Sequence, residues 1–428
     1  MKVLMFGWEF PPHIAGGLGT ACYGLTKGLA HHNIEVLFVM PKASNDEDQR
    51  YVQIINASNV DVDPRNAHLT IFENQVSFIE VNSQLVPYIG MNEYYKIVDQ
   101  LESGVMETSE STGEKRRYTF SGKYNENLMS EVEEYAIVAA EIASKYDFDV
   151  IHAHDWLTYK AGIAAKKMSG KPLVVHMHAT EYDRSGEHRI NDLVYGIEKY
   201  GMSEADAVCA VSDLTRRTVI EKYGIRADKV FTLHNAVEPS NKNIKREKFV
   251  KEKIVTFLGR VTFQKGPEYF IESAKKVLEK DPNVRFVLAG DGDLMPKVIE
   301  HVAELGISDR FHFTGFLRGN DIDTMFGMSD VYVMPSISEP FGISPLEAMS
   351  ASVPVVISKQ SGVAEVLTHA IKVDFWDVDA MADAIYGILH YPALANFFAI
   401  KGKEDVDSLK WDHVAAKLIG IYNSLIQH

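Results

Sequence analysis

The sequence predicts an α/β fold of two Rossmann-like domains that face each other across a cleft. Short runs of apolar and β-branched residues alternate with longer amphipathic stretches, which is the pattern of strands and helices in a parallel sheet. The pattern occurs twice, and the polar segment 239–253 separates the two series. With 428 residues and 46% apolar composition, the chain is long enough to form two hydrophobic cores.

The first series defines a domain over residues 1–240. Its predicted strands are short and rich in Val, Ile and Leu: 3–6, 36–40, 150–152, 173–177 and 208–211. Between 131 and 146, apolar residues recur at helical spacing, so a helix leads into the third of these strands. The polar stretch at about 88–127 is predicted to be an insertion, and both a plain cover for the sheet and a cover for a substrate fit it.

The second series defines a domain over residues 241–408. Its predicted strands are 254–258, 285–289, 311–313, 331–334 and 353–357. The last segment, 409–428, predicts a helix with an apolar face made by Val414, Leu418, Ile421 and Leu425. Two interpretations of this helix stay open: it crosses back to brace the first domain, or it packs locally.

Composition limits the classes of partner and the compartment. Lys and Arg total 44 against 59 acidic residues, a formal net charge of −15, which disfavours binding to nucleic acid. No run is long and apolar enough to predict stable membrane insertion, and the start lacks the features of a signal peptide. Only Cys22 and Cys209 are present, which is typical of a reducing compartment. We therefore expect a cytoplasmic protein.

A glycine pair follows the first predicted strand. Gly16 and Gly17 stand where a helix begins, so backbone N–H groups there can approach a diphosphate closely. The spacing matches neither the dinucleotide fingerprint nor a P-loop, and a tight strand-to-helix turn explains it equally well.

Two H-x-H pairs, at 152–154 and 176–178, end predicted strands of the first domain. Alternate residues of a strand point to the same face, so each pair presents two imidazoles to one site. One interpretation is the metal site of a metallohydrolase. The other is a sugar-binding site, in which His154, Asp155 and Trp156 line the acceptor side and His178 reaches the transferred sugar.

The second domain carries a cationic loop after its first strand. Arg260 and Lys265, on a loop that begins at Gly259, can both bind a pyrophosphate and neutralise the charge that grows as a nucleotide departs. An exposed Arg and Lys without function is the alternative. Asp291 and Gly292 belong to one of several Asp-x-Asp strings, and we interpret this one as a donor-binding loop rather than a Mg²⁺ site.

Two acids occur in E-x7-E spacing after the strand at 331–334. Glu339 is predicted on the loop and Glu347 on the helix that follows it. Carboxylates accept hydrogen bonds from the paired hydroxyls of sugars and ribose, and the helix start can face a phosphate.

Together these motifs resemble the retaining GT-B glycosyltransferases, in the same order along essentially the whole chain. The motifs are P-P-x-x-x-G-G at 11–17, H-D-W at 154–156, G-R at 259–260 with K-G at 265–266, A-G-D-G at 289–292, and the segment 339–347. The opening 17 residues and H-A-H-D-W are most similar to bacterial and archaeal glycogen and starch synthases. The resemblance implies a GT-B fold, retention of anomeric configuration, and no metal or other cofactor.

The resemblance also assigns roles to residues. It implies a catalytic set of Arg260, Lys265, Glu339 and His178, in which the two cations hold the donor diphosphate and the other two hold the donor sugar. Glu347 would bind the nucleotide ribose, and the backbone amides of Gly342 and Ile343 would contact phosphate. The implied donor-binding set is Gly16, Gly17, Gly259, Asp291, Gly292, Phe341, Gly342, Ile343 and Glu347.

We therefore expect a hexosyltransferase that moves glucose from a nucleotide diphosphate onto an α-glucan. The alternative acceptor is a lipid or surface-polysaccharide intermediate. Ile14 stands where the family's bacterial glycogen synthases usually carry a lysine, so UDP-glucose and ADP-glucose both stay open as donors. The expected partners are thus a nucleotide sugar and a glycan acceptor.

Overall fold

The computed structural model describes residues 1–13, 17–63, 117–122, 124, 127–186, 190–237 and 250–427. Most of the predicted insertion at 88–127 and residues 239–249 of the polar segment at 239–253 lie outside these residues. The chain forms two compact units, one made of Met1–His234 with Trp411–His428 and the other of Asn235–Lys410. The prediction of an α/β fold with two Rossmann-like units is confirmed, and each unit is described by itself below.

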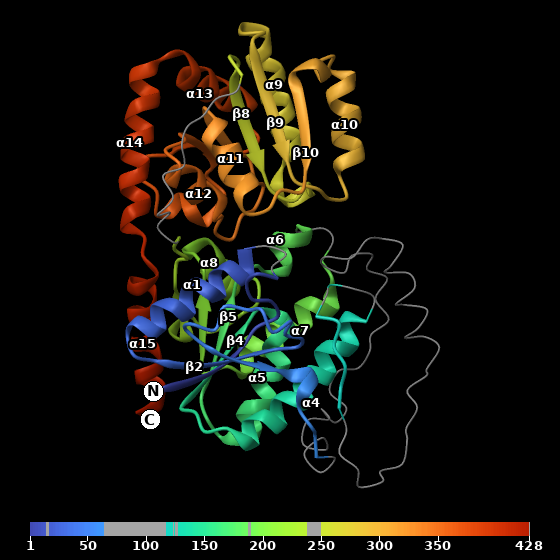
Figure 1. Cartoon of the computed structure of the whole chain (residues 1–428), viewed down its shortest axis with the longest axis vertical. Coiled ribbons are helices and arrows are strands. Elements are labelled where there is room, and N and C mark those ends of the chain that lie inside the picture. Colours follow the sequence, from blue (N-terminus) through green and yellow to red (C-terminus); the bar gives the residue numbers. More distant parts are fainter. Residues whose placement is uncertain are drawn as a thin grey trace. The chain divides into compact units, whose positions relative to one another are not determined.

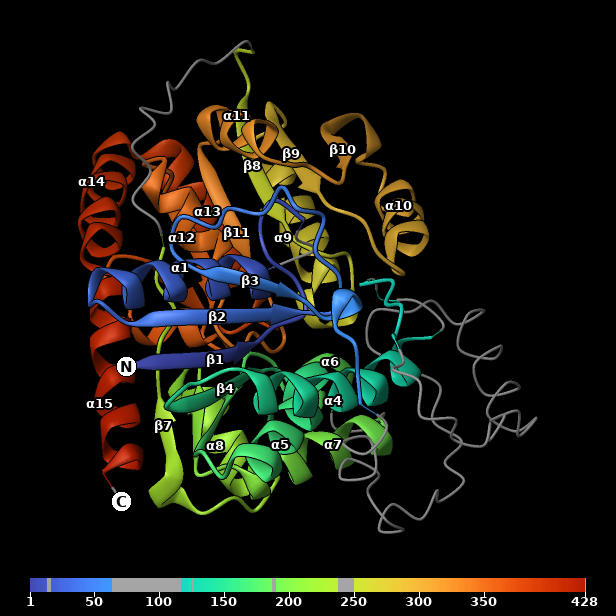
Figure 2. The same ribbon diagram turned by 60° about the horizontal axis from the view of Figure 1, so that its bottom comes forward.

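The first unit is built on a parallel sheet of seven described strands. Their order is β3 (Gln53–Asn56), β2 (Glu35–Met40), β1 (Lys2–Phe6), β4 (Val150–His154), β5 (Leu173–Met177), β6 (Ala207–Ala210) and β7 (Val230–Thr232). Figure 2 shows β1 between β2 and β4. Five of these strands are almost wholly buried, because a parallel sheet carries helices on both faces; they are β1, β2, β4, β5 and β6.

The helices of this unit cover the two faces of the sheet. They are α1 (Gly17–His31), α4 (Leu128–Lys145), α5 (Trp156–Ser169), α6 (Glu181–Ser185), α7 (Asp192–Glu204), α8 (Asp213–Glu221) and α15 (Trp411–Ile426). The main core joins α4, α5 and α7 to strand residues such as Leu4, Ile151 and Val175. The alternate strand positions, which include His152, face the opposite side, where Tyr422 of α15 contacts that histidine.

The C-terminal helix α15 lies beside α1 within the first unit (Figure 1). A Cβ added at Gly24 of α1 would lie 2.1 Å from the indole nitrogen of Trp411, so glycine permits this close approach. The buried face of α15 is made by Trp411, Ala415, Leu418 and Tyr422. Of the predicted face, Leu418 is buried, whereas Val414, Ile421 and Leu425 are only partly buried, because the two large aromatic side chains take the buried positions.

The second unit contains a parallel sheet of six described strands. Their order is β10 (Phe311–Gly315), β9 (Val284–Ala289), β8 (Lys253–Leu258), β11 (Val331–Met334), β12 (Val355–Ser358) and β13 (Ile371–Val373). Its helices are α9 (Pro267–Lys280), α10 (Met295–Glu304), α11 (Asn320–Met328), α12 (Ser344–Ser350), α13 (Val378–His390) and α14 (Pro392–Ser408) (Figure 1). The core packs α9, α10 and α13 against residues such as Phe257 and Leu288.

Strand order reverses once in each sheet, between β1 and β4 in the first and between β8 and β11 in the second. In open parallel sheets, ligands bind outside the carboxyl ends of the strands at this switch point. The loops that follow these four strands are therefore where a site is expected. Among the described helices, none is both long enough and apolar enough to cross a membrane.

Candidate functional site

The loops after β8 and β9 touch each other in the second unit. The N–H of Gly259 donates to the carbonyl of Ala289 at 3.0 Å, and the N–H of Val261 donates to the carbonyl of Asp291 at 2.9 Å. Gly290 has φ +138, and a Cβ added to it would lie 1.8 Å from the carbonyl oxygen of Gly259. Only glycine fits there, which explains the A-G-D-G string in physical terms.

The two loops also approach each other closely at Gly292, where an added Cβ would lie 2.4 Å from the carbonyl oxygen of Val261. The structure thus brings Asp291 and Gly292 next to the loop that carries Arg260, whose side chain is exposed. The predicted donor-binding positions Gly259, Asp291 and Gly292 thus share one loop cluster with Arg260 at the end of the sheet.

Lys265 and Glu339 form an ion pair in the second unit. Lys265 ends the 3-10 turn η3 (Phe263–Lys265) after β8, and Glu339 lies on the loop after β11. The hydroxyl of Ser336 donates to the same carboxylate at 3.3 Å. A buried acid is stable when it is paired and hydrogen-bonded, and Glu339 is only 6% exposed. The switch-point loops therefore hold a cation and an acid in contact.

The segment after Glu339 turns sharply before helix α12. Gly342 has φ +98, and the carbonyl of the buried Phe341 accepts a hydrogen bond from the N–H of Val363 at 2.7 Å. Ile343 precedes α12 directly, and its backbone carbonyl accepts from the N–H of Glu347 at 3.1 Å. This turn places the backbone amides of Gly342 and Ile343 at the start of α12.

Glu347 is the fourth residue of α12. Burial raises the pKa of its carboxyl group to about 7, and the nearby carboxylate of Asp323 on α11 adds to the shift. A carboxyl group with such a pKa accepts hydrogen bonds from hydroxyls when it is ionised, and it can also donate one when it is protonated. Perturbed carboxyl groups of this kind cluster at functional sites, although structural networks also produce them.

In the first unit, the glycine pair is only half described. Gly16, like Ile14, lies outside the described residues. Gly17 is exposed and begins α1, and the N–H of Gly19 donates to the buried carboxylate of Glu9 at 3.2 Å. The first turn of α1 lies on the connection that follows β1 at the switch point. One of its backbone N–H groups, that of Gly19, is already hydrogen-bonded to Glu9.

His154 and His178 meet at the other side of this switch point. The Nδ1 atom of His154 lies 2.9 Å from the Nε2 atom of His178, which follows β5 directly. Burial lowers the pKa of His178 to about 3, so its imidazole is neutral at physiological pH. A neutral imidazole can both donate to and accept from a sugar hydroxyl.

Asp155 and Trp156 follow His154 and differ in environment. Asp155 has φ 64, an uncommon backbone conformation for a non-glycine residue, and burial raises the pKa of its carboxyl group to about 6. Trp156 is fully buried in the core of the first unit. It packs inside the protein, whereas Asp155 has a buried oxygen, Oδ1, without a partner among the described residues.

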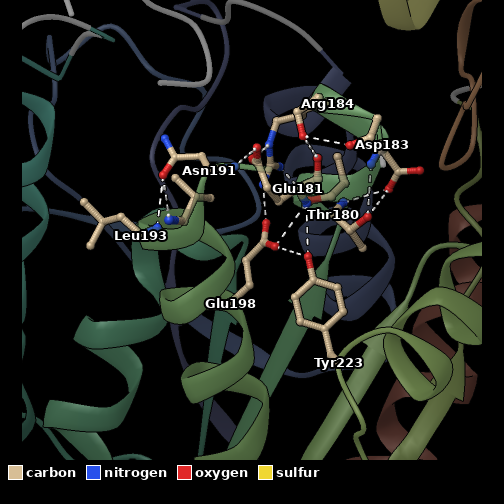
Figure 3. Close-up of polar contacts among 12 residues, drawn as sticks. Thr180, Glu181, Asp183, Arg184, Asn191, Leu193, Glu198 and Tyr223 are labelled. Atoms are coloured by element: carbon tan, nitrogen blue, oxygen red, sulfur yellow. Dashed lines mark hydrogen bonds and ion pairs between the residues drawn. The ribbon is translucent and has the colours of Figure 1, made fainter. Parts of the chain in front are cut away.

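A buried polar network supports the chain segment that carries His178 (Figure 3). The guanidinium of Arg184 donates to the carbonyl of Ala179 at 2.7 Å and to Glu181 at 3.3 Å, and it pairs with Glu198. The hydroxyl of Tyr223 donates to Glu198, and the N–H of Glu181 donates to Tyr223 at 3.2 Å. Because Ala179 follows His178 directly, the network fixes the backbone at that histidine.

The residues of this network were not among the predicted site residues. A local signal existed only for its first turn, where Thr180 and Asp183 form a capping box at the start of α6. The contacts of Glu198 and Tyr223 join residues that are far apart in the sequence, so no local spacing predicts them. The prediction that residues of both units serve one cleft is not tested here and stays a prediction.

Comparison with known families agrees with this arrangement of motifs. The model of the starch synthase catalytic domain matches residues 2–233, and the model of group 1 glycosyl transferases matches residues 240–405. Two parallel-sheet units of this kind, each matched by a glycosyltransferase model, define a GT-B glycosyltransferase. The chain belongs to the glycogen and starch synthase-like members of that class, and it is thus not a metallohydrolase.

Individual relatives span nearly its whole length. An uncharacterized glycosyltransferase of Methanocaldococcus jannaschii is 27% identical over 446 residues, covering 99% of this chain and 98% of the relative. A glycogen synthase of Mycobacterium tuberculosis is 24% identical over 444 residues, covering 99% and 94%. The crystal structure of Anabaena HepE with UDP and glucose has the same fold, with a TM-score of 0.67 and 17% identity over 99% and 100% of the two chains.

Proposed function

We propose that this glycosyltransferase moves glucose from a nucleoside diphosphate onto the end of an α-glucan, with retention of the anomeric configuration. The contact between Lys265 and Glu339 carries the proposal, because it places a cation and an acid on the two loops of the switch point. The relationship to a glycogen synthase over nearly the whole chain supports glucose as the sugar and a glucan as the acceptor.

In this proposal the cations act on the leaving group. Arg260 and Lys265 bind the donor diphosphate and neutralise the charge that develops as the bond to the sugar breaks. Lys265 pairs with Glu339, and Arg260, whose side chain is exposed, is the second cation of the proposed donor site. Glu347 binds the hydroxyls of the nucleotide ribose, and the amides of Gly342 and Ile343 contact phosphate.

The acid and the neutral histidine orient the sugar. Glu339 and His178 each hydrogen-bond to sugar hydroxyls, and His154 and Asp155 lie on the acceptor side. The departing phosphate accepts the proton of the attacking hydroxyl on the same face of the sugar, so no side chain forms a covalent adduct. The protein then contributes positioning and charge stabilisation, without a metal or another cofactor in the reaction.

The donor nucleotide is proposed to be UDP or ADP. A structural neighbour was solved with UDP and glucose, which supports UDP. The relationship to a glycogen synthase leaves ADP equally open, and Ile14 provides no cation that would favour it.

The test is a panel of donors and acceptors. Purified protein is incubated with UDP-, ADP- and GDP-glucose, with and without glycogen or maltooligosaccharide, and the release of nucleoside diphosphate is measured. The proposal expects release from UDP- or ADP-glucose that depends on a glucan. Release that depends on a lipid-linked acceptor, with none on glucans, would replace the proposed acceptor.

A further inference from the structure

Four histidines form an array on the face of the first sheet that Tyr422 covers; His152, His154 and His176 are buried, and His178 is half-buried. His152 and His154 alternate on β4, His176 lies on β5 opposite His154, and His178 follows β5. Ring centroids are 4.3 Å apart for His152 and His154, 5.3 Å for His154 and His176, and 4.4 Å for His176 and His178. The proposed function uses His154 and His178, which leaves His152 and His176 without a role.

The ring nitrogens of this array divide into two groups. Nδ1 of His152 contacts the hydroxyl of Tyr422, and Nδ1 of His154 lies 2.9 Å from Nε2 of His178. The remaining nitrogens of the first three histidines are buried and have no partner among the described residues. They are Nε2 of His152, Nε2 of His154, and both Nδ1 and Nε2 of His176.

Such a concentration of unsatisfied nitrogens in one place is unusual. A buried polar atom without a partner destabilises the fold, and here several lie side by side. His152, His154 and His176 each offer a nitrogen, and these three atoms lie within 4.8 Å of one another. A metal ion that accepts one imidazole lone pair from each of the three histidines would remove most of this penalty and would leave one nitrogen of His176 without a partner among the described residues.

We propose that His152, His154 and His176 bind one divalent transition-metal ion of the zinc type inside the first unit. Neutral imidazole is a preferred ligand of such ions. In histidine ligands one ring nitrogen binds the metal while the other is held by a hydrogen bond, and His152 and His154 already have that second contact through Nδ1.

Binding requires the three rings to rotate toward a common centre. Zn–N distances of about 2.0–2.1 Å in a tetrahedral site place ligand nitrogens roughly 3.4 Å apart, closer than the 4.8 Å limit found here. The ion would tie β4 to β5 and, through His152, to Tyr422 of α15.

This ion has a structural role and takes no part in the transfer of sugar. The inference shares His154 with the proposed function, but its test does not use activity, so either proposal can fail without the other. It also differs from a cluster at the surface of the same unit, where His13 lies with Asp46 and Glu47, since that group is mostly exposed.

The experiment measures metal in untagged protein produced with Zn²⁺ in the medium. The protein is washed with a chelator and passed through gel filtration, and its metal content is measured by inductively coupled plasma mass spectrometry. One equivalent of zinc per chain is expected. Loading with Co²⁺ is expected to give the visible absorption of a tetrahedral site. Zn²⁺ is expected to raise the melting temperature, and Mg²⁺ is not, because Mg²⁺ prefers oxygen ligands.

Substitutions test which histidines bind the metal ion. His176→Gln and His152→Gln are expected to lose the metal, and His13→Gln, the matched control at the exposed cluster, is expected to keep it. Tyr422→Phe retains every ligand but removes a supporting hydrogen bond, so it is expected to bind about 10–100-fold more weakly. Wild-type protein that holds no zinc or cobalt, or His176→Gln protein that folds and holds a full equivalent, would overturn the proposal.

Discussion

The ammonium group of Lys265 contacts the carboxylate of Glu339, although 74 positions separate them in the sequence. The contact joins the loop after β8 to the loop after β11, the two strands between which the order of the sheet reverses. A close approach of backbone accompanies it, since a Cβ added to Gly266 would lie 2.3 Å from the carbonyl oxygen of Pro335. The second unit thus builds one polar site from two segments that are distant in sequence.

Removing either cation is expected to slow turnover strongly. Arg260→Ala and Lys265→Ala should each lower kcat by about 10²–10³-fold, because lost stabilisation of developing charge costs about 3–4 kcal/mol. Lys275→Ala, on the exposed surface of α9, is the matched control and should keep wild-type turnover. Steady-state assays of nucleotide release check the prediction, and near wild-type rates in both site variants would reject the roles proposed for these cations.

The ion pair itself predicts non-additive stability. Lys265→Met leaves the buried Glu339 without its cation, and Glu339→Gln leaves Lys265 without its acid, so each should destabilise the fold. The double variant should lose less than the sum, with a coupling of about 0.5–3 kcal/mol in urea unfolding. Strictly additive free energies of unfolding would mean that the two groups do not interact in solution.

Gly290 is expected to tolerate no side chain. Gly290→Ala places a Cβ 1.8 Å from the carbonyl oxygen of Gly259 at a φ of +138, so it should destabilise the protein by more than about 1 kcal/mol. Gly387→Ala is the control, because that glycine lies within α13 and the nearest atom to its added Cβ is 3.7 Å away. The control should be neutral or stabilising by up to about 1 kcal/mol. Equal melting temperatures for the two variants would contradict this account of the loop.

Glu198 predicts a dependence of stability on pH. Burial raises the pKa of its carboxyl group from 4.5 to about 7, with Arg184 and the Tyr223 hydroxyl acting in the opposite direction. The folded state therefore binds the proton more tightly than the unfolded state, and this group's stabilisation is complete below pH 4.5. It is lost as pH rises from about 4.5 to 7 and stays lost above that range.

Glu198→Gln imitates the protonated acid at every pH. Its free energy of unfolding should therefore improve relative to wild type as pH rises from about 5 to 7, by at most roughly 3 kcal/mol. Glu221→Gln, on the exposed end of α8, serves as the control and should show no such trend. Chemical denaturation at several pH values makes the measurement, and a constant difference between wild type and Glu198→Gln would show that the pKa is not raised.

Much of the fold followed from local pattern. The predicted strand at 173–177 coincides with β5, and that at 331–334 coincides with β11, because buried parallel strands are continuous apolar runs bounded by turns. Strands β3, β7 and β13 were missed. All three lie at edges of their sheets, where strands are short and their burial is incomplete, so their sequences carry a weak apolar signal.

The chemistry of the site was only partly predictable. The types and spacing of Arg260, Lys265 and Glu339 indicated anion and sugar binding, but the contact between Lys265 and Glu339 depends on the order of strands in the sheet. Likewise, the H-x-H spacing placed two imidazoles on one face of each strand. Only the register of β4 against β5, with His154 opposite His176, shows that the two pairs form a single array.

The configuration of the product tests the central claim most directly. UDP- or ADP-glucose, whose sugar has the α configuration, is supplied with maltooligosaccharide, and the new linkage is identified by NMR of the anomeric proton. Retaining transfer onto an α-glucan predicts an α-linked glucose added to the end of the chain. A β-linked product, or free glucose without elongation, would contradict the account.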